Sequence, residues 1–218
     1  MQDFDFQVII DSLPFLWRGM QLSLLLTGLA LCIGLALGTV LAIMRVWGPA
    51  PVKWVSAIYV NTFRSVPLIL VIFWFYFLVP LVTGASIGQF YSALIAFSLF
   101  EAAYYAEIMR AGFNSVSRDQ YFAGQAIGLT YRKNMQYIIL PQAVRNMVPV
   151  LITQAVILFQ DTSLVYVVAL RDFMTSASVV ASREGRLVEM YTFAAVVYFV
   201  ICFSGSMFVK RLQKKTVS

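Results

Sequence analysis

Long apolar runs alternate with short charged segments along the whole sequence. The apolar runs lie near residues 19–44, 66–82, 90–110, 147–170 and 190–209. A helix of about 20 apolar residues is long enough to cross the hydrocarbon core of a bilayer. The pattern therefore predicts an all-α membrane protein with five transmembrane helices, built as a single domain over residues 1–218.

The composition agrees with a membrane location and argues against several functions. Hydrophobic residues make up 61% of the chain and charged residues 12%, at a mean hydropathy of +0.81, whereas soluble domains carry about 25% charged residues. There is no histidine, and no Cys, Asp or Glu cluster has the spacing of metal ligands. We therefore expect no metal site, no cofactor and no catalytic triad. A G-x-x-x-x-G-K-[ST] phosphate loop is also missing, so any ATP is expected to bind to another chain.

The basic residues predict how the chain is oriented. Lys and Arg outnumber Asp and Glu by 16 to 10, and in membrane proteins such an excess gathers in cytoplasmic loops and indicates no nucleic-acid site. With the N-terminus outside, twelve of the 16 fall in cytoplasmic segments, four of them in the C-terminal tail. The first segment carries Asp3, Asp5 and Asp11 and no basic residue before Arg18. It lacks the positive start of a secretory signal, so we expect a mature, periplasmic N-terminus and a cytoplasmic C-terminus.

A polar loop at residues 117–145 separates the third and fourth spans. A helix-forming stretch runs up to Gly128, Thr130 can cap a second helix, and Pro141 is expected to end that helix. Small residues before the turn, among them Gly124, are expected to let the surface of another protein approach closely. The loop is thus predicted to form a helix–turn–helix knob on the cytoplasmic side.

Several motifs give the chain a resemblance to a known family. The spacing from Ala123-Gly124 to Gly128 and then to Leu140-Pro141 resembles the "EAA" loop of ABC importer permeases, although Phe122 stands where that motif most often has glutamate. Three further strings resemble signatures of the polar amino-acid branch of these permeases. They are Phe63-Arg64-Ser65-Val66-Pro67-Leu68, the run 103–112 (AYYAEIMRAG) and Asp161-Thr162-Ser163-Leu164.

The resemblance implies a type I ABC importer permease fold in which the loop is a cytoplasmic coupling helix that sits in a groove of an ATP-hydrolysing subunit. It implies a multi-pass protein of the bacterial inner membrane that performs no chemistry itself. The expected partners are a homologous second permease subunit, two ATP-binding subunits, a periplasmic solute-binding protein and the lipid membrane. The residues expected to couple to the ATPase are Ala123, Gly124, Gly128, Leu129, Arg132, Lys133 and Pro141.

The substrate is suggested by resemblance alone. The strings FRSVPL, FSLFEAAYYAEIMRAG and VILFQDTSLVYV are most similar to glutamate/aspartate importer permeases, and Gln160 stands where many relatives have lysine. An importer of the same type for glutamine or basic amino acids remains an alternative. A channel subunit that does not use ATP is a remote one, because it needs no compact knob. A membrane-embedded enzyme would need convergent catalytic groups, which the sequence lacks.

The transport pathway needs hydrogen-bond donors, or the positive end of a helix dipole, at mid-membrane for an anionic substrate. Ionisable residues inside a span are costly and therefore functional candidates, although Glu107 is also expected to pair with Arg110 or Arg64. Asp161 could receive the ammonium group of a substrate, or instead pair with or cap a neighbouring helix. The pathway candidates are Arg64, Glu101, Tyr104, Gln154, Gln160, Asp161, Thr162 and Ser163.

Overall fold

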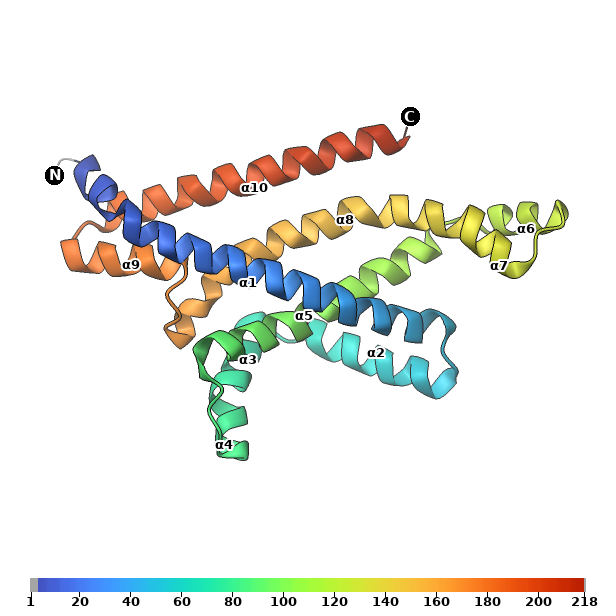
Figure 1. Ribbon diagram of the computed structural model, residues 1–218, viewed down its shortest axis with the longest axis horizontal. Coiled ribbons are helices and arrows are strands. Elements are labelled where there is room, and N and C mark those ends of the chain that lie inside the picture. Colours follow the sequence, from blue (N-terminus) through green and yellow to red (C-terminus); the bar gives the residue numbers. More distant parts are fainter. Residues whose placement is uncertain (1–3, 218) are drawn as a thin grey trace.

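The computed structural model describes residues 4–217, with side chains for residues 4–213. Asp3 and the side chains of Lys214 and Lys215 lie outside this range. The long helices α1 (Phe6–Trp47), α5 (Gly88–Asn114), α8 (Leu140–Asp161) and α10 (Leu187–Val217) run along the long axis of the molecule (Figure 1). The elements described are all helical, as the apolar pattern predicted.

Helices α1 and α5 pack closely because α1 presents glycine to α5. A Cβ atom added at Gly38 would lie 2.7 Å from the Tyr105 Cβ and 3.0 Å from the Ala102 carbonyl oxygen. Small residues at such positions let two membrane helices approach through their backbones. The opposite face of α1 exposes large apolar side chains such as Leu25 and Val40, which suits contact with lipid.

The return from α1 to α5 is a bent pair of helices instead of one straight span. Helix α2 (Ala50–Arg64) packs against α1 and α5, and the stretch Leu68–Thr83 that follows is turned by 103° from it. The predicted second span, 66–82, falls on this stretch, which at 1.5 Å per residue is only about 24 Å long. It meets the length of a membrane span only together with α2.

Helices α1 and α10 both run from the side of the N-terminus toward the side of the knob helices α6 and α7 (Figure 1), as the first and the last of an odd number of crossings would. The structure contains four single helical segments long and apolar enough to cross a membrane within the described residues, and the bent pair brings this number to five. Five crossings therefore agree with the fold class predicted from the sequence.

The prediction that Pro141 ends a helix was wrong. Helical structure continues from α7 (Tyr131–Asn134) through a π-helical turn, η2 (Met135–Ile139), into α8. In the π turn the Leu140 N–H donates to the Met135 carbonyl, five residues back. This wider turn makes room for the proline ring, which in an α-helix would clash with the carbonyl four residues earlier.

A π turn also precedes a proline in the bent pair formed by α2 and the stretch Leu68–Thr83. Helix α3 (Leu68–Phe73) leads into a second π turn, η1 (Trp74–Leu78), and then into α4 (Val79–Thr83), which carries Pro80 as its second residue. Each π turn thus ends two residues before a proline. Both prolines therefore widen a helix without ending it.

The end of the molecule near the N-terminus is closed by η3 (Thr162–Val168) and α9 (Phe173–Glu184). Asp172 caps α9, because its carboxylate accepts hydrogen bonds from the Met174 N–H at 3.1 Å and the Thr175 N–H at 2.9 Å. Capping by Asp satisfies backbone donors that the helix itself leaves unpaired. Phe173 and Ala177 then bury one face of α9 against α1 and α10.

Candidate coupling surface and transport pathway

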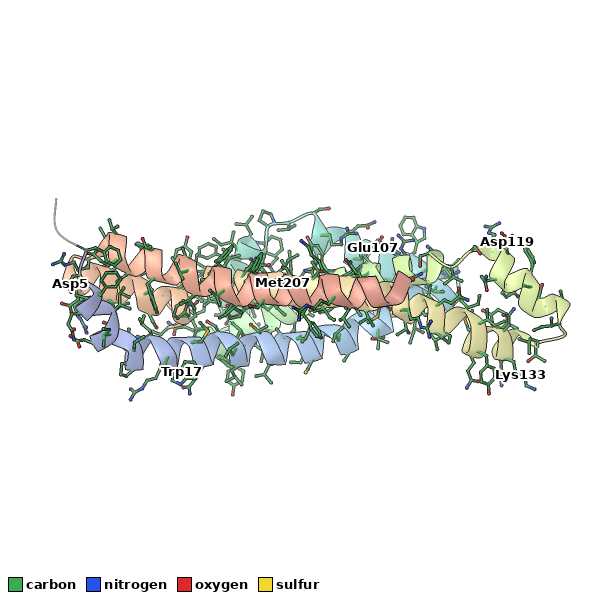
Figure 2. All side chains as sticks on the ribbon, turned by 90° about the horizontal axis from the view of Figure 1, so that it is seen from above. Asp5, Trp17, Glu107, Asp119, Lys133 and Met207 are labelled. Carbon is green, nitrogen blue, oxygen red and sulfur yellow. The ribbon has the colours of Figure 1, made fainter. Side chains whose placement is uncertain are left out.

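The loop at residues 117–145 projects beyond the bundle as a separate knob. Helix α6 (Arg118–Ala126) and α7 lie side by side at the end of the molecule opposite the N-terminus (Figure 1). Figure 2 shows Asp119 and Lys133 together at this far end, with Asp5 at the other. We call the segment 118–134 the knob. Its surface leaves large apolar side chains exposed, including Phe122 at 58% and Ile127 at 74%.

The turn of the knob depends on the backbone of Gly128. This residue has a φ of +81°, a conformation that costs residues with a Cβ roughly 1–2 kcal/mol. Its N–H donates to the Gln125 carbonyl at 2.9 Å, and the Leu129 N–H donates to the Gly124 carbonyl at 3.1 Å. Thr130 occupies the N-cap position of α7, although its side chain makes no capping hydrogen bond. The helix–turn–helix predicted from the sequence is present.

The role expected for Gly124 needs correction. Gly124 is buried, and a Cβ there would overlap the side chain of Asn134. Asn134 is itself fully buried and donates from Nδ2 to the Tyr121 carbonyl at 2.8 Å. Gly124 therefore lets α6 and α7 pack together and offers no surface to another protein. Asn134 could not be identified from the sequence, because the residues around it do not distinguish a buried asparagine from a solvated one.

The other coupling candidates differ in position. Ala123, Arg132 and Lys133 are exposed on the knob, and Leu129 is half-buried in the turn. Pro141 is exposed as well, but it lies in α8, past the π turn.

Glu107 lies at the centre of an ionic cluster on α5, between the middle of the molecule and the knob (Figure 2). Its carboxylate accepts hydrogen bonds from Arg45 Nη1 at 2.9 Å, from Arg110 Nε at 3.0 Å and from Arg110 Nη2. Arg64 Nη1 lies 3.9 Å away. The predicted pairing of Glu107 with Arg110 or Arg64 is confirmed for both. Arg45, from α1, was not anticipated.

Two pathway candidates from the sequence meet beside this cluster. The Arg64 guanidinium lies over the ring of Tyr104, 5.4 Å from its centroid. Such cation–π contacts contribute about 0.5–1 kcal/mol at exposed sites. Arg64 remains 39% exposed, so it retains donors that a further anion could reach.

Glu101 lies nearly two helical turns earlier on α5 and has a different environment. It is fully buried, and Gln154 Nε2 on α8 lies 3.2 Å from both of its carboxylate oxygens. Among the described residues no cation pairs with Glu101. The structure thus brings Glu101 and Gln154 together, apart from the arginine cluster. Tyr105, whose hydroxyl is buried without a hydrogen-bond partner, faces the same α1–α5 contact.

The candidates at the end of α8 are only partly available to a substrate. Thr162 is buried and its hydroxyl donates to the Phe159 carbonyl at 2.7 Å, so it is not a free donor. Ser163 lines a groove of about 910 Å³ between η3, α9 and α10, and Gln160 is exposed. Asp161 makes no hydrogen bond or ion pair with any described residue. It occupies the N-cap position of η3 without a side-chain capping bond, so neither structural alternative for this residue is realised.

Taken together, the helical membrane bundle, the charged groups inside it and the projecting knob define a membrane permease that is built to contact a separate protein. The comparison with protein families agrees. Residues 10–218 match the family described as binding-protein-dependent transport system inner membrane component. The chain belongs to this family.

Individual relatives cover nearly the whole chain. It is 49% identical over 99% of its length, and 100% of the relative, to the glutamate/aspartate import permease protein GltK of Escherichia coli. It is 32% identical over 98% of both chains to the arginine transport system permease protein ArtQ of Bacillus subtilis. A solved amino acid ABC transporter crystallised with histidines matches with a TM-score of 0.91 at 29% identity, over 97% of this chain and 98% of that one.

Family membership has direct consequences for the roles of this chain. It is a multi-pass inner-membrane permease, the transmembrane part of an ABC transporter and not its ATPase. An ATPase and a solute-binding protein are therefore its partners in general terms. The chemistry of ATP hydrolysis therefore belongs to the ATPase and not to this chain.

Proposed function

We propose that this permease imports glutamate and aspartate. The observation that carries the proposal is the 49% identity to GltK over 99% of the chain, because the similarity extends over all five apolar runs that a substrate would have to pass. A corresponding permease for glutamine or basic amino acids is the alternative, since permeases for different amino acids share these motifs.

The proposed assembly contains a homologous second permease subunit, two ATP-binding subunits and a periplasmic solute-binding protein. Support comes from polar groups that this chain leaves partly open at membrane depth. Asp161 and Gln154 are only half-buried and Gln160 is exposed, and such groups are costly when they face lipid. A second permease, with an aqueous pathway between the two subunits, would cover them.

The proposed orientation places the knob in the cytoplasm and the N-terminus in the periplasm. The knob end carries Arg45, Lys53, Arg110, Arg132 and Lys133, in keeping with the preference of basic residues for the cytoplasmic side. ATP binding would close the ATPase dimer and move the knob together with α8, since helical structure is continuous from α7 into α8. Rigid-body motion of this kind is how alternating access operates in transporters.

Different pathway residues would interact with different charged groups of the substrate. Asp161, which has no partner among the described residues, would receive the ammonium group. Arg64 would attract the carboxylates nearer the knob. Glu101 would act through Gln154, which it orients from α5. Ala123, Gly128, Leu129, Arg132, Lys133 and Pro141 would contact or support the ATPase groove.

The test is uptake of radiolabelled glutamate in cells that lack the gene, in the same cells with it restored, and in cells carrying Asp161→Asn. Unlabelled aspartate, glutamine and arginine serve as competitors. We expect the restored uptake to be competed by aspartate alone, and Asp161→Asn to lower it about tenfold with unchanged protein level. Competition by glutamine or arginine instead would reject the acidic substrate and leave the permease assignment intact.

A further inference from the structure

A second basic site lies outside the pathway, where α1 ends, α2 begins and α5 ends. It is an open pocket of about 540 Å³ that combines basic, amide and apolar side chains. Its lining residues are Arg45, Val46, Lys53, Trp54, Ala57, Ile58, Asn61, Arg110 and Asn114. None of these nine residues is acidic.

The positive charge of this pocket is not neutralised within the described chain. Glu107 is the one described carboxylate that pairs with Arg45 and Arg110, and it shares its charge with Arg64 as well. One negative charge therefore faces three guanidinium groups, and Lys53 adds a fourth cation at the pocket. A carboxylate has room for about four donated hydrogen bonds, whereas each guanidinium has five N–H donors. Most of the donors remain available to an external anion.

The depth of the pocket indicates where such an anion would come from. Trp54 lines the pocket and is 72% exposed, and Trp47 at the end of α1 is 43% exposed. Exposed tryptophans collect at the membrane–water interface. The end of α1 and the start of α2, which line the pocket, lie toward the end of the bundle from which the knob projects (Figure 1). On the proposed orientation this is the cytoplasmic leaflet, which is rich in anionic lipid.

We propose that this pocket binds the phosphate of an anionic phospholipid headgroup in the leaflet on the knob side. Arg45, Arg110 and Lys53 contact the phosphate oxygens, and Asn61 and Asn114 supply neutral donors. The apolar side chains of Trp54 and Ile58 lead from the basic residues onto the exposed face of α2, where an acyl chain would lie. Free inorganic phosphate could accept hydrogen bonds from the same donors, but it has no apolar part that would contact Trp54 and Ile58.

The experiment uses the complete purified transporter in nanodiscs of mixed phosphatidylglycerol and phosphatidylcholine. Native mass spectrometry counts the lipids retained by the wild type and by Lys53→Gln. Lys210→Gln is the matched control, because it removes an exposed lysine from α10 and leaves the pocket intact. An exposed ion pair contributes up to about 1 kcal/mol, so loss of the contact between Lys53 and the phosphate should lower retention of phosphatidylglycerol about fivefold in Lys53→Gln. Lys210→Gln removes the same charge without breaking a pocket contact, so its retention should remain unchanged.

Two results would overturn the proposal. Equal loss of phosphatidylglycerol in both variants would indicate attraction by overall charge and no site at the pocket. Binding of added radiolabelled inorganic phosphate in pure phosphatidylcholine discs, together with no retention of phosphatidylglycerol by the wild type, would assign the pocket to free phosphate instead of lipid. Glutamate uptake is a separate readout, so loss of the substrate assignment leaves this test unaffected.

Discussion

The knob and the Glu107 cluster lie on adjoining parts of the same chain but are built by opposite means. The knob is shaped by backbone conformation at Gly128 and by one buried asparagine, and it leaves Phe122 and Ile127 exposed. The cluster is shaped by side chains from α1, α2 and α5 that converge on one carboxylate. The Glu107 carboxylate finds its partners within this chain, whereas the apolar side chains of Phe122 and Ile127 on the knob stay exposed in it.

This difference predicts whether a substitution will impair folding of the permease or its coupling to the ATPase. An error in the cluster leaves charge unpaired among membrane helices, so folding of the permease should suffer first. An error in the knob changes a small exposed element that few other residues contact, so insertion and folding should survive while coupling to the ATPase fails. The substitutions below separate these two outcomes, beginning with the largest expected effect.

Glu107→Gln should be the most damaging, because it leaves Arg45, Arg64 and Arg110 with no carboxylate between them. Removing one partner of a buried ion pair costs about 3–5 kcal/mol, and the lower end applies because the Glu107 side chain is still 21% exposed. Thermal unfolding of the purified transporter should therefore occur at a clearly lower temperature, with less permease in the membrane.

The matched control is Glu184→Gln. Glu184 pairs with its neighbour Arg183 at 2.7 Å, but both side chains are largely exposed, and exposed pairs contribute about 0–1 kcal/mol. Unfolding of this variant should resemble that of the wild type. If both variants unfolded alike, the cluster would not stabilise the fold and the contrast with the knob would fail.

Periodicity and motif spacing predicted most of the fold and part of this site. Five apolar runs predicted the helices, and the position of Glu107 near the cytoplasmic end of its span predicted the pairing with Arg110 or Arg64. Arg45 was missed, because a contact between residues 45 and 107 depends on how α1 and α5 pack and leaves no local pattern. The 103° bend between α2 and the stretch that follows it was missed for a related reason, since the angle between two helices depends on how they pack and leaves no local pattern.

The structural roles of the glycine and proline residues were harder to predict from the sequence than those of the charged residues. Spacing predicted a turn at Gly128, but it also assigned Gly124 to a surface that another protein approaches, whereas Gly124 is buried against Asn134. Pro141 was expected to end a helix and is instead accommodated by a π turn. In each case the sequence indicates an unusual backbone position, but the neighbouring atoms decide which conformation results.

Gly128→Leu should have the next largest effect and should act on transport alone. No atom lies within 4 Å of a Cβ added at Gly128, so the cost arises from its φ of +81° and amounts to about 1–2 kcal/mol. Uptake should fall about tenfold while the amount of permease in the membrane stays constant. ATP hydrolysis by the assembled transporter should no longer respond to the solute-binding protein.

Gly84→Leu provides the control for Gly128→Leu. Gly84 has a φ of +72° and equally open space around it, but it lies in the turn after α4, far from the knob (Figure 1). The backbone cost is the same, so normal uptake by Gly84→Leu would assign the defect of Gly128→Leu to the knob. Gly128→Asn should recover part of the uptake, since asparagine tolerates positive φ. Equal uptake by the two leucine variants would reject the coupling role.

The smallest effect is expected at the edge of the ionic cluster, where Tyr104→Leu removes the ring beneath Arg64. The cation–π contact at 5.4 Å should contribute about 0.5–1 kcal/mol, so the permease should unfold only slightly earlier than the wild type. Tyr104→Phe keeps the ring and should behave as the wild type in the same measurement. If Phe were as harmful as Leu, the hydroxyl of Tyr104 would matter more than its ring, and this residue would belong to the transport pathway and not to the support of Arg64.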